Sequence, residues 1–188
     1  THAHGDHFDA RLTRSYLERN PTGIFVSTQE TVDLLQKDYP AFEKVQGRVK
    51  AFEPKEGERI SVMLNGIDLE ILNLPHGASV TNLGFVVHIG GWKILHTGDV
   101  AQATALQSYG IAKEQIDIAF VPYYFLVESE FLTKEGSSVA LDAIQTKRIV
   151  PMHYAPTDQN VKSIYQQILA RFPDSILFQQ TMETRVVQ

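Results

Sequence analysis

The strongest constraint on the fold is a change of pattern in the middle of the chain, from β-hairpins to alternating strands and helices. Asn65-Gly66 and Gly90-Gly91 each separate two short apolar segments, which is the sequence signature of a hairpin. Beyond residue 96 the expected strands and helices alternate, as they do in sheets whose strands are joined by helical connections. We therefore expect a mixed sheet of the α/β (α+β) class.

The spacing of apolar residues sets bounds for these elements. Strands are expected over 24–26, 48–52, 59–64, 67–71, 84–89, 92–96, 116–121, 148–151 and 175–178, and helices over 8–20, 31–37, 102–109, 137–145 and 160–171. Phe8, Leu12, Tyr16 and Leu17 fall on one apolar face of the first helix. Ser27 and Glu30 have the spacing of a capping box before the second helix.

Length and composition favour one compact globular domain over residues 1–188. The chain has 188 residues, 43% of them hydrophobic and 21% charged, which excludes a disordered, collagen-like or coiled-coil protein. The net charge of −5 and the lack of a basic block do not favour nucleic acid as a partner. The longest apolar run, over 118–127, is interrupted by Pro122 and is too short to span a membrane. We expect a soluble protein of unassigned oligomeric state, with the cytoplasm slightly favoured.

Metal-ligating side chains are concentrated at the start of the chain. His2, His4, Asp6 and His7 lie within seven residues, which a packing role does not explain. In an extended segment His2 and His4 point to the same side, whereas Asp6 and His7 face another direction. One short segment can therefore serve two metal ions. Since the chain has no cysteine, a tightly held metal must use imidazole and carboxylate ligands.

Three further candidates follow expected strands: His76, Asp99 and His153. Strand ends are where functional sites gather in open α/β sheets. Each residue is weak evidence when taken alone, because a histidine after a strand usually has a structural role. Their combination with the first segment is a strong signal of a metal site.

This combination resembles the metallo-β-lactamase-fold hydrolases, whose pattern is H-x-H-x-D-H followed by a lone His, a lone Asp and a last His. The resemblance implies a four-layer αβ/βα sandwich, here without its N-terminal strands. It further implies two metal sites with a shared ligand, namely His2, His4 and His76 for the first, Asp6, His7 and His153 for the second, and Asp99 bridging them. The Gly-Asp pair and the Pro-Met-His-Tyr ending are most similar to the ascorbate-phosphate-lactonase-like and general metal-dependent hydrolase branches.

The implied cofactors are two divalent ions. Zn²⁺ is favoured, and Mn²⁺ or Fe²⁺ remain open, because all three accept imidazole and carboxylate. A metal-bridging hydroxide would attack an ester, lactone, phosphoester or phosphodiester bond of a small, anionic or carbonyl-bearing substrate, with Asp6 and Asp99 as the catalytic carboxylates. The proton for the leaving group would come from a metal-bound water, from Asp99 or from Tyr154.

For other side chains the sequence allows two interpretations. His96 is expected either to orient a ligand or to pack at a strand end. Tyr123 and Tyr124 are expected either to line the pocket or to belong to an aromatic core. His88, inside a strand pattern, is expected to be structural. Two alternatives to hydrolysis stay open, namely a catalytically silent metal-binding or interaction module and a di-iron oxidoreductase on the same fold.

Overall fold

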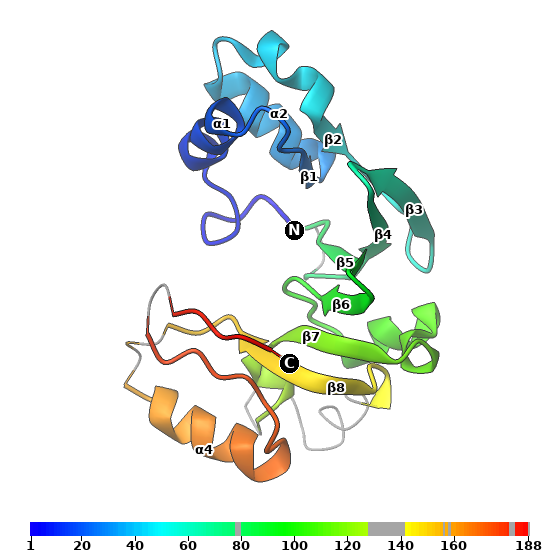
Figure 1. Ribbon diagram of the computed structural model, residues 1–188, viewed down its shortest axis with the longest axis vertical. Helices are drawn as coiled ribbons and strands as arrows, with labels where there is room; N and C mark the ends of the chain where they lie inside the picture. Colours follow the sequence, from blue (N-terminus) through cyan, green and yellow to red (C-terminus); the bar gives the residue numbers. More distant parts are fainter. Residues whose placement is uncertain (78–79, 128–141, 156, 158, 181–182, 188) are drawn as a thin grey trace.

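The computed structural model describes residues 1–77, 80–127, 142–155, 157, 159–180 and 183–187, and it contains two β-sheets with helices packed beside them (Figure 1). A two-stranded parallel sheet lies with the first helices in the upper part of the view, and a six-stranded sheet extends below it. None of the helices in this described part has the length and apolar character to cross a bilayer.

The N-terminal part is a helical unit around a small sheet. Its elements are α1 (Ala10–Arg19), β1 (Phe25–Ser27), α2 (Gln29–Asp38), η1 (Phe42–Lys44), η2 (Gln46–Arg48) and β2 (Val49–Ala51). Asp9 caps α1, because its carboxylate accepts a hydrogen bond from the Leu12 N–H at 2.9 Å. The Arg48 guanidinium donates to carbonyls at the end of α1 and in the next turn. Buried side chains of α1, α2 and β2 form a core of their own, with Leu17 and Leu35 at its centre.

The six-stranded sheet has the order β3-β4-β5-β6-β7-β8, so each strand lies beside its neighbour in sequence. Strands β3 to β6 are antiparallel, whereas β6, β7 and β8 are parallel. The bounds are β3 (Arg59–Leu64), β4 (Ile67–Asn73), β5 (Leu83–Ile89), β6 (Trp92–His96), η3 (Ala103–Tyr109), η4 (Ile111–Lys113), β7 (Ile116–Pro122), η5 (Tyr123–Phe125), β8 (Thr146–Met152) and α4 (Val161–Arg171).

Turn chemistry confirms both predicted hairpins. Asn65 and Gly66 have φ of 50° and 80°, and Gly90 and Gly91 have φ of 58° and 82°. Two successive residues with positive φ are what a tight two-residue hairpin turn requires, and Asn and Gly tolerate this conformation best. The change from antiparallel to parallel pairing at β6 is confirmed as well.

The main core fills the space between this sheet and α4. Ile164 and Ile168 of α4 are buried in the same cluster as Ala119 of β7 and Ile149 of β8. Apolar residues of the loops after β4 and β6 also belong to this cluster. The loops that carry candidate ligands are therefore anchored in the core.

Several expected elements differ from the structure. Strand β2 does not join the antiparallel sheet but pairs in parallel with β1, Phe25 opposite Val49. Residues 175–178 form no strand, although the Ile176 N–H donates to the Ile149 carbonyl at 2.8 Å. The expected helix over 102–109 is the 3₁₀ helix η3, and most of the one expected over 137–145 lies outside the described residues.

The two N-terminal helices also correct details of the predictions. Thr28, not Ser27, caps α2, because the Thr28 hydroxyl accepts the Thr31 N–H at 3.2 Å. Of the apolar face expected for the first helix, Leu17 is buried and Phe8 packs against the same core, whereas Leu12 and Tyr16 are exposed by 71% and 53%. Leu17 is the residue through which α1 enters the core.

Candidate metal centre

The candidate ligands come from four segments that end at one place in the fold. His2, His4, Asp6 and His7 belong to the segment before α1, which is tied to β5 by a hydrogen bond from the Leu83 N–H to the Thr1 carbonyl. This segment runs between the helical unit and β5 (Figure 1). The other candidates stand just beyond the ends of β4, β6 and β8 and are His76, Asp99 and His153.

The first group of ligands is formed by three imidazoles. The ring centroids of His2 and His4 are 4.5 Å apart, and that of His76 lies 4.9 Å from His2 and 5.2 Å from His4. One nitrogen from each ring lies within 4.8 Å of the others. His2 is fully buried and His4 is exposed, so the group reaches from the interior to the surface. Three converging neutral imidazoles are a typical binding site for a divalent transition metal.

The second group joins two carboxylates to two imidazoles. The Oδ2 atom of Asp99 lies 2.9 Å from Nε2 of His7 and 3.0 Å from Nε2 of His153. Oδ2 of Asp6 lies 3.6 Å from Nε2 of His7 and 3.9 Å from Nε2 of His153. This mixture of nitrogen and oxygen donors suits Zn²⁺, Mn²⁺ or Fe²⁺.

Asp99 lies between the two groups. Its Oδ2 atom is also 3.9 Å from Nε2 of His2, which belongs to the first group, and the residue is only 1% exposed. The structure thus brings all seven predicted ligands together, with the aspartate at the position expected of a shared ligand.

Unpartnered buried atoms support a cation at this place. His2 Nε2, His76 Nδ1 and Asp99 Oδ1 are buried without a hydrogen-bond partner. An unsatisfied buried polar atom is costly, about 1–3 kcal/mol. All three atoms are of types that ligate metals, and each belongs to one of the two groups. A pair of cations would satisfy them, so the side chains present fit the predicted metal ions.

Thr1 holds two of the imidazoles, a role that the sequence did not suggest. Its Oγ1 atom lies 3.0 Å from Nδ1 of His2 and 3.0 Å from Nδ1 of His7. A hydroxyl oxygen has two lone pairs and can accept from both Nδ1–H groups, which leaves both Nε2 atoms free to ligate. His2 and His7 belong to different groups, so one hydroxyl orients a ligand in each.

Asn82 holds the loops that carry Asp99 and His76. Its Nδ2 donates to the Leu74 and Thr97 carbonyls, each at 3.1 Å, and its Oδ1 accepts the Asp99 N–H at 3.2 Å. Asn82 is fully buried. The role of Asn82 is seen only in its hydrogen bonds to backbone groups of the two loops. The sequence around it has no motif that would have predicted this role.

Electrostatics keep His2 in the form that binds metals. Burial lowers the pKa of His2 to about 4, and repulsion by His7 acts in the same direction against the attraction of Asp99. For Asp6, burial is the largest influence and acts upward, but a backbone hydrogen bond and the neighbouring imidazoles bring its pKa below the ordinary value. A neutral imidazole and an ionised carboxylate are therefore present at neutral pH.

Asp6, His7, Asp99 and His153 line a cavity of about 460 Å³. The wall is completed by His96, Met152, Tyr154 and Ala155. The ligands of the second group therefore face a space that can admit a small molecule. Burial, the largest influence, lowers the pKa of His96 to about 4, so this wall residue is neutral at neutral pH.

The tyrosines predicted near the site have different places. Tyr124 packs edge-on against His153, with ring centroids 5.6 Å apart, while its hydroxyl donates to the Val100 carbonyl. Tyr154 lines the cavity, but its hydroxyl donates to the Phe178 carbonyl. Burial raises the pKa of both phenols. Tyr123 packs against the main core.

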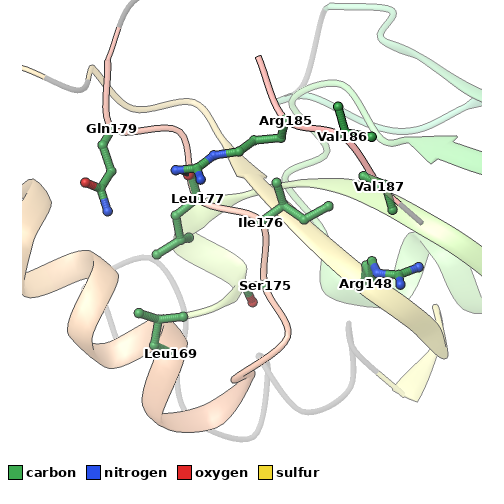
Figure 2. Close-up of a pocket in the computed structure, with 9 residues that line it drawn as sticks. All are labelled: Arg148, Leu169, Ser175, Ile176, Leu177, Gln179, Arg185, Val186 and Val187. Atoms are coloured by element: carbon green, nitrogen blue, oxygen red, sulfur yellow. Dashed lines mark hydrogen bonds between the residues drawn. The ribbon is translucent and has the colours of Figure 1, made fainter. Parts of the chain in front are cut away.

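A second cavity, of about 550 Å³, lies between β8, α4 and the C-terminal segment (Figure 2). It is lined by apolar side chains, two arginines, a serine and a glutamine, namely Arg148, Leu169, Ser175, Ile176, Leu177, Gln179, Arg185, Val186 and Val187. Because this lining has no imidazole or carboxylate, it does not offer a metal site. His88 also lies away from the centre and bonds Glu70 at 2.9 Å, as expected of a structural residue.

Comparison with known proteins agrees with the geometry. The model of a family described as beta-lactamase superfamily domain matches residues 1–154. A UPF0173 metal-dependent hydrolase of Thermus thermophilus is 27% identical over 162 residues, which cover 82% of this chain and 63% of that protein. Another of the same name from Symbiobacterium thermophilum is 36% identical over 73 residues, 38% of this chain and 31% of that protein. The chain thus spans less than two thirds of these relatives.

A solved structure supports the fold as well. The metallo-beta-lactamase fold protein YhfI of Bacillus subtilis superposes with a TM-score of 0.50 at 10% identity, covering 81% of this chain and 60% of that one. The mixed sheets and helices described above are therefore those of the metallo-β-lactamase fold.

Proposed function

The chain belongs to the family of β-lactamase superfamily domains, and on that basis we propose that it is a metal-dependent hydrolase with two divalent cations. The observation that carries the proposal is the position of Asp99. This buried carboxylate lies within 3.0 Å of imidazoles from two other segments and 3.9 Å from His2, and one of its oxygens has no partner. A charge in such a place requires compensation.

The proposed ligand sets follow the two groups. One cation is held by His2, His4 and His76, the other by Asp6, His7 and His153, and Asp99 is shared. When bound, such cations supply the Lewis acidity that ionises water near neutral pH and stabilises developing negative charge. Zn²⁺ is the favoured ion, and Mn²⁺ or Fe²⁺ would accept the same imidazole and carboxylate donors.

The proposed substrate is a small molecule with an anionic or carbonyl-bearing group. Two carboxylates, Asp6 and Asp99, do not neutralise two divalent cations, so the cavity attracts negative charge despite the net charge of −5. The bond is proposed to be an ester, lactone, phosphoester or phosphodiester. Hydrolysis adds hydroxide to the carbon or phosphorus atom and a proton to the departing oxygen.

The source of that proton is a further part of the proposal. The Tyr154 hydroxyl, considered from the sequence, is engaged with the Phe178 carbonyl. Asp99, by contrast, lies within the cavity wall beside both groups. We therefore propose a metal-bound water or Asp99, and not Tyr154, as the source of the proton.

We also propose that residues 1–188 act as one unit. The ligands before α1 belong to the segment that enters the helical unit, and the remaining ligands belong to the large sheet. Neither part holds a complete set, so the site exists only when the two are assembled.

The ligand assignment is tested by metal content. Plasma mass spectrometry of the zinc-loaded chain is expected to give about two equivalents, as a two-metal site requires. Asp99→Ala and His153→Ala are expected to lose about one of them or more, because each removes a ligand of the second cation. His88→Ala, which removes an imidazole bonded to Glu70, serves as the control and keeps both. Full metal content in both ligand variants would falsify the assignment.

The type of reaction is tested with chromogenic substrates. Lactones, carboxyl esters, phosphomonoesters and phosphodiesters are assayed with added Zn²⁺ or Mn²⁺ and after chelation. Turnover that disappears on chelation supports hydrolysis. Silence across the panel at full metal loading favours the metal-binding module, and an iron absorbance spectrum would reveal a di-iron centre.

A further inference from the structure

His96 is an imidazole of the cavity wall that belongs to neither ligand group. It is the last residue of β6, and its ring stacks on that of Phe120 in the neighbouring strand β7. The ring centroids are 5.7 Å apart and the planes differ by 22°. Two paired strands and a stacked ring therefore hold this imidazole in a fixed plane beside the metal ligands.

A backbone hydrogen bond determines which nitrogen of His96 carries the proton. The Gly98 N–H donates to Nδ1 at 3.1 Å. A ring nitrogen that accepts such a bond carries no hydrogen, so the neutral ring has its hydrogen on Nε2. Nδ1 of His96 is thus occupied by the Gly98 N–H, and Nε2 is the nitrogen that can donate a hydrogen bond.

We propose that His96 is a substrate-binding residue that donates a hydrogen bond from Nε2–H to an oxygen atom of the acyl or phosphoryl group being hydrolysed. The inference rests on the proposed function, and it assigns a contact to the substrate instead of to a cation. An uncharged donor of fixed tautomer complements an oxyanion, because it needs no rearrangement when negative charge develops.

The two other imidazoles that line the cavity, His7 and His153, direct their Nε2 atoms at Asp99. Nδ1 of His7 is engaged with the Thr1 hydroxyl, and its Nε2 lies 2.9 Å from Asp99. Nε2 of His153 lies 3.0 Å from the same carboxylate. A neutral ring whose Nε2 ligates a cation carries its hydrogen on Nδ1, whereas His96 carries it on Nε2.

A purely structural role makes a different prediction. In that case Nδ1 alone matters, because it receives the Gly98 N–H and so fixes the loop that carries Asp99. Asparagine offers an acceptor near the position of Nδ1 but no group that reaches as far as Nε2. Glutamine offers an amide N–H near the position of Nε2 but no acceptor at Nδ1. His96→Asn and His96→Gln therefore separate the two functions of the ring.

The experiment uses the zinc-loaded chain and inorganic phosphate as the probe oxyanion. His96→Asn is expected to keep the zinc content and melting temperature of the wild type while its phosphate dissociation constant rises about tenfold, the effect of one lost hydrogen bond. His96→Gln is expected to recover phosphate binding to within about threefold of wild type. Calorimetry measures the binding, and mass spectrometry measures the zinc.

A spectroscopic readout tests the tautomer directly. In chain labelled with ¹⁵N-histidine, the signals missing from His96→Asn identify His96, and they are expected to report hydrogen on Nε2. Phosphate is expected to move that proton signal downfield. The inference is overturned by hydrogen on Nδ1, by an unmoved signal, by equal phosphate affinity of His96→Asn and wild type, or by a zinc-loaded wild type that does not bind phosphate. A chain that binds no zinc overturns the proposed function first, and this inference with it.

Discussion

His153 has a left-handed backbone, with φ of 65°, although it has a side chain. A residue with a Cβ pays about 1–2 kcal/mol for this conformation. The turn comes directly after β8 and brings the ring to 3.0 Å from Asp99. Strain of this kind is kept where packing enforces it and is common at functional sites. The local backbone at His153 therefore places a candidate ligand beside Asp99.

Gly98 is the position in the Asp99 loop where a side chain is least tolerated. Its φ is 55°, and a Cβ atom built there would lie 2.1 Å from Oδ1 of Asn82. We predict that Gly98→Ala lowers the free energy of unfolding by about 3 kcal/mol, from clash and backbone strain together. Zinc affinity should fall as well, since Asn82 binds the Asp99 N–H. Denaturant unfolding and zinc titration measure the two effects.

Gly66→Ala provides the matched control for this substitution. Gly66 has φ of 80°, but a Cβ there meets no atom within 4 Å, and the residue lies in the turn between β3 and β4. It should lose only about 1 kcal/mol through backbone strain. Its zinc affinity should stay that of the wild type. Equal zinc affinities for both glycine variants would contradict the role given to the Asp99 loop.

Among the elements, the loops after β4 and β6 depend on the residue just before β5. Asn82 makes three hydrogen bonds to these loops from a fully buried position. We predict that Asn82→Ala destabilises the chain by about 3 kcal/mol, because buried backbone groups lose their partners. Zinc affinity is expected to fall about tenfold or more, as it does when groups that support ligands are removed.

Asn73→Ala is the comparison for that prediction. The Asn73 side chain at the end of β4 donates one hydrogen bond, to the Pro54 carbonyl at 2.9 Å. Losing it should cost about 1 kcal/mol and leave zinc affinity unchanged. If the two asparagine variants lost zinc to the same degree, Asn82 would have no special role in positioning Asp99.

Local sequence was sufficient to predict the hairpins and the succession of the later strands. Asn65-Gly66 and Gly90-Gly91 encode their own turns, and the bounds of β3 and β6 agree with the expected ones. Pairing was harder to predict. Strand β2 has three residues, too few for their pattern to distinguish a partner, and it joins β1 across the whole of α2.

The convergence of the candidate ligands could be predicted, whereas the residues that support them could not. Histidine and aspartate are residue types that bind metals, and the order of seven of them in the sequence was enough to indicate the resemblance to a family. Thr1 and Asn82 act on ring nitrogens and backbone groups that only the folded chain brings near. For the first helix, helical spacing correctly placed Leu17 in the core of the helical unit, but Leu12 and Tyr16 of the same expected face are exposed.

On the scale of the whole molecule, the buried apolar residues of the described ranges include two separate clusters. One belongs to α1, α2 and β2, the other to the large sheet and α4. The candidate cations lie where the segment before α1 meets the sheet, so each group of ligands draws on both parts. Binding energy at this place therefore stabilises the assembly of the two parts.

Removal of metal tests this coupling. A thousandfold excess of zinc over its dissociation constant should add about 4 kcal/mol to stability, and chelation should remove it. We predict that chelation lowers the melting temperature and accelerates amide exchange in α1 more than in α4, because α1 follows the ligand segment directly. Calorimetry and hydrogen exchange provide the measurements. Uniform loss of protection across both helices would argue against a local link.

The hydroxyl of Thr1 touches one ring from each group. Because the same oxygen contacts both rings, a change at Thr1 acts on the two groups together. Replacing it with a residue that lacks an acceptor would free both rings to rotate at once. Binding of a cation to one ligand group is thus expected to affect binding to the other group. A change in the ion that one group prefers would likewise alter the other group.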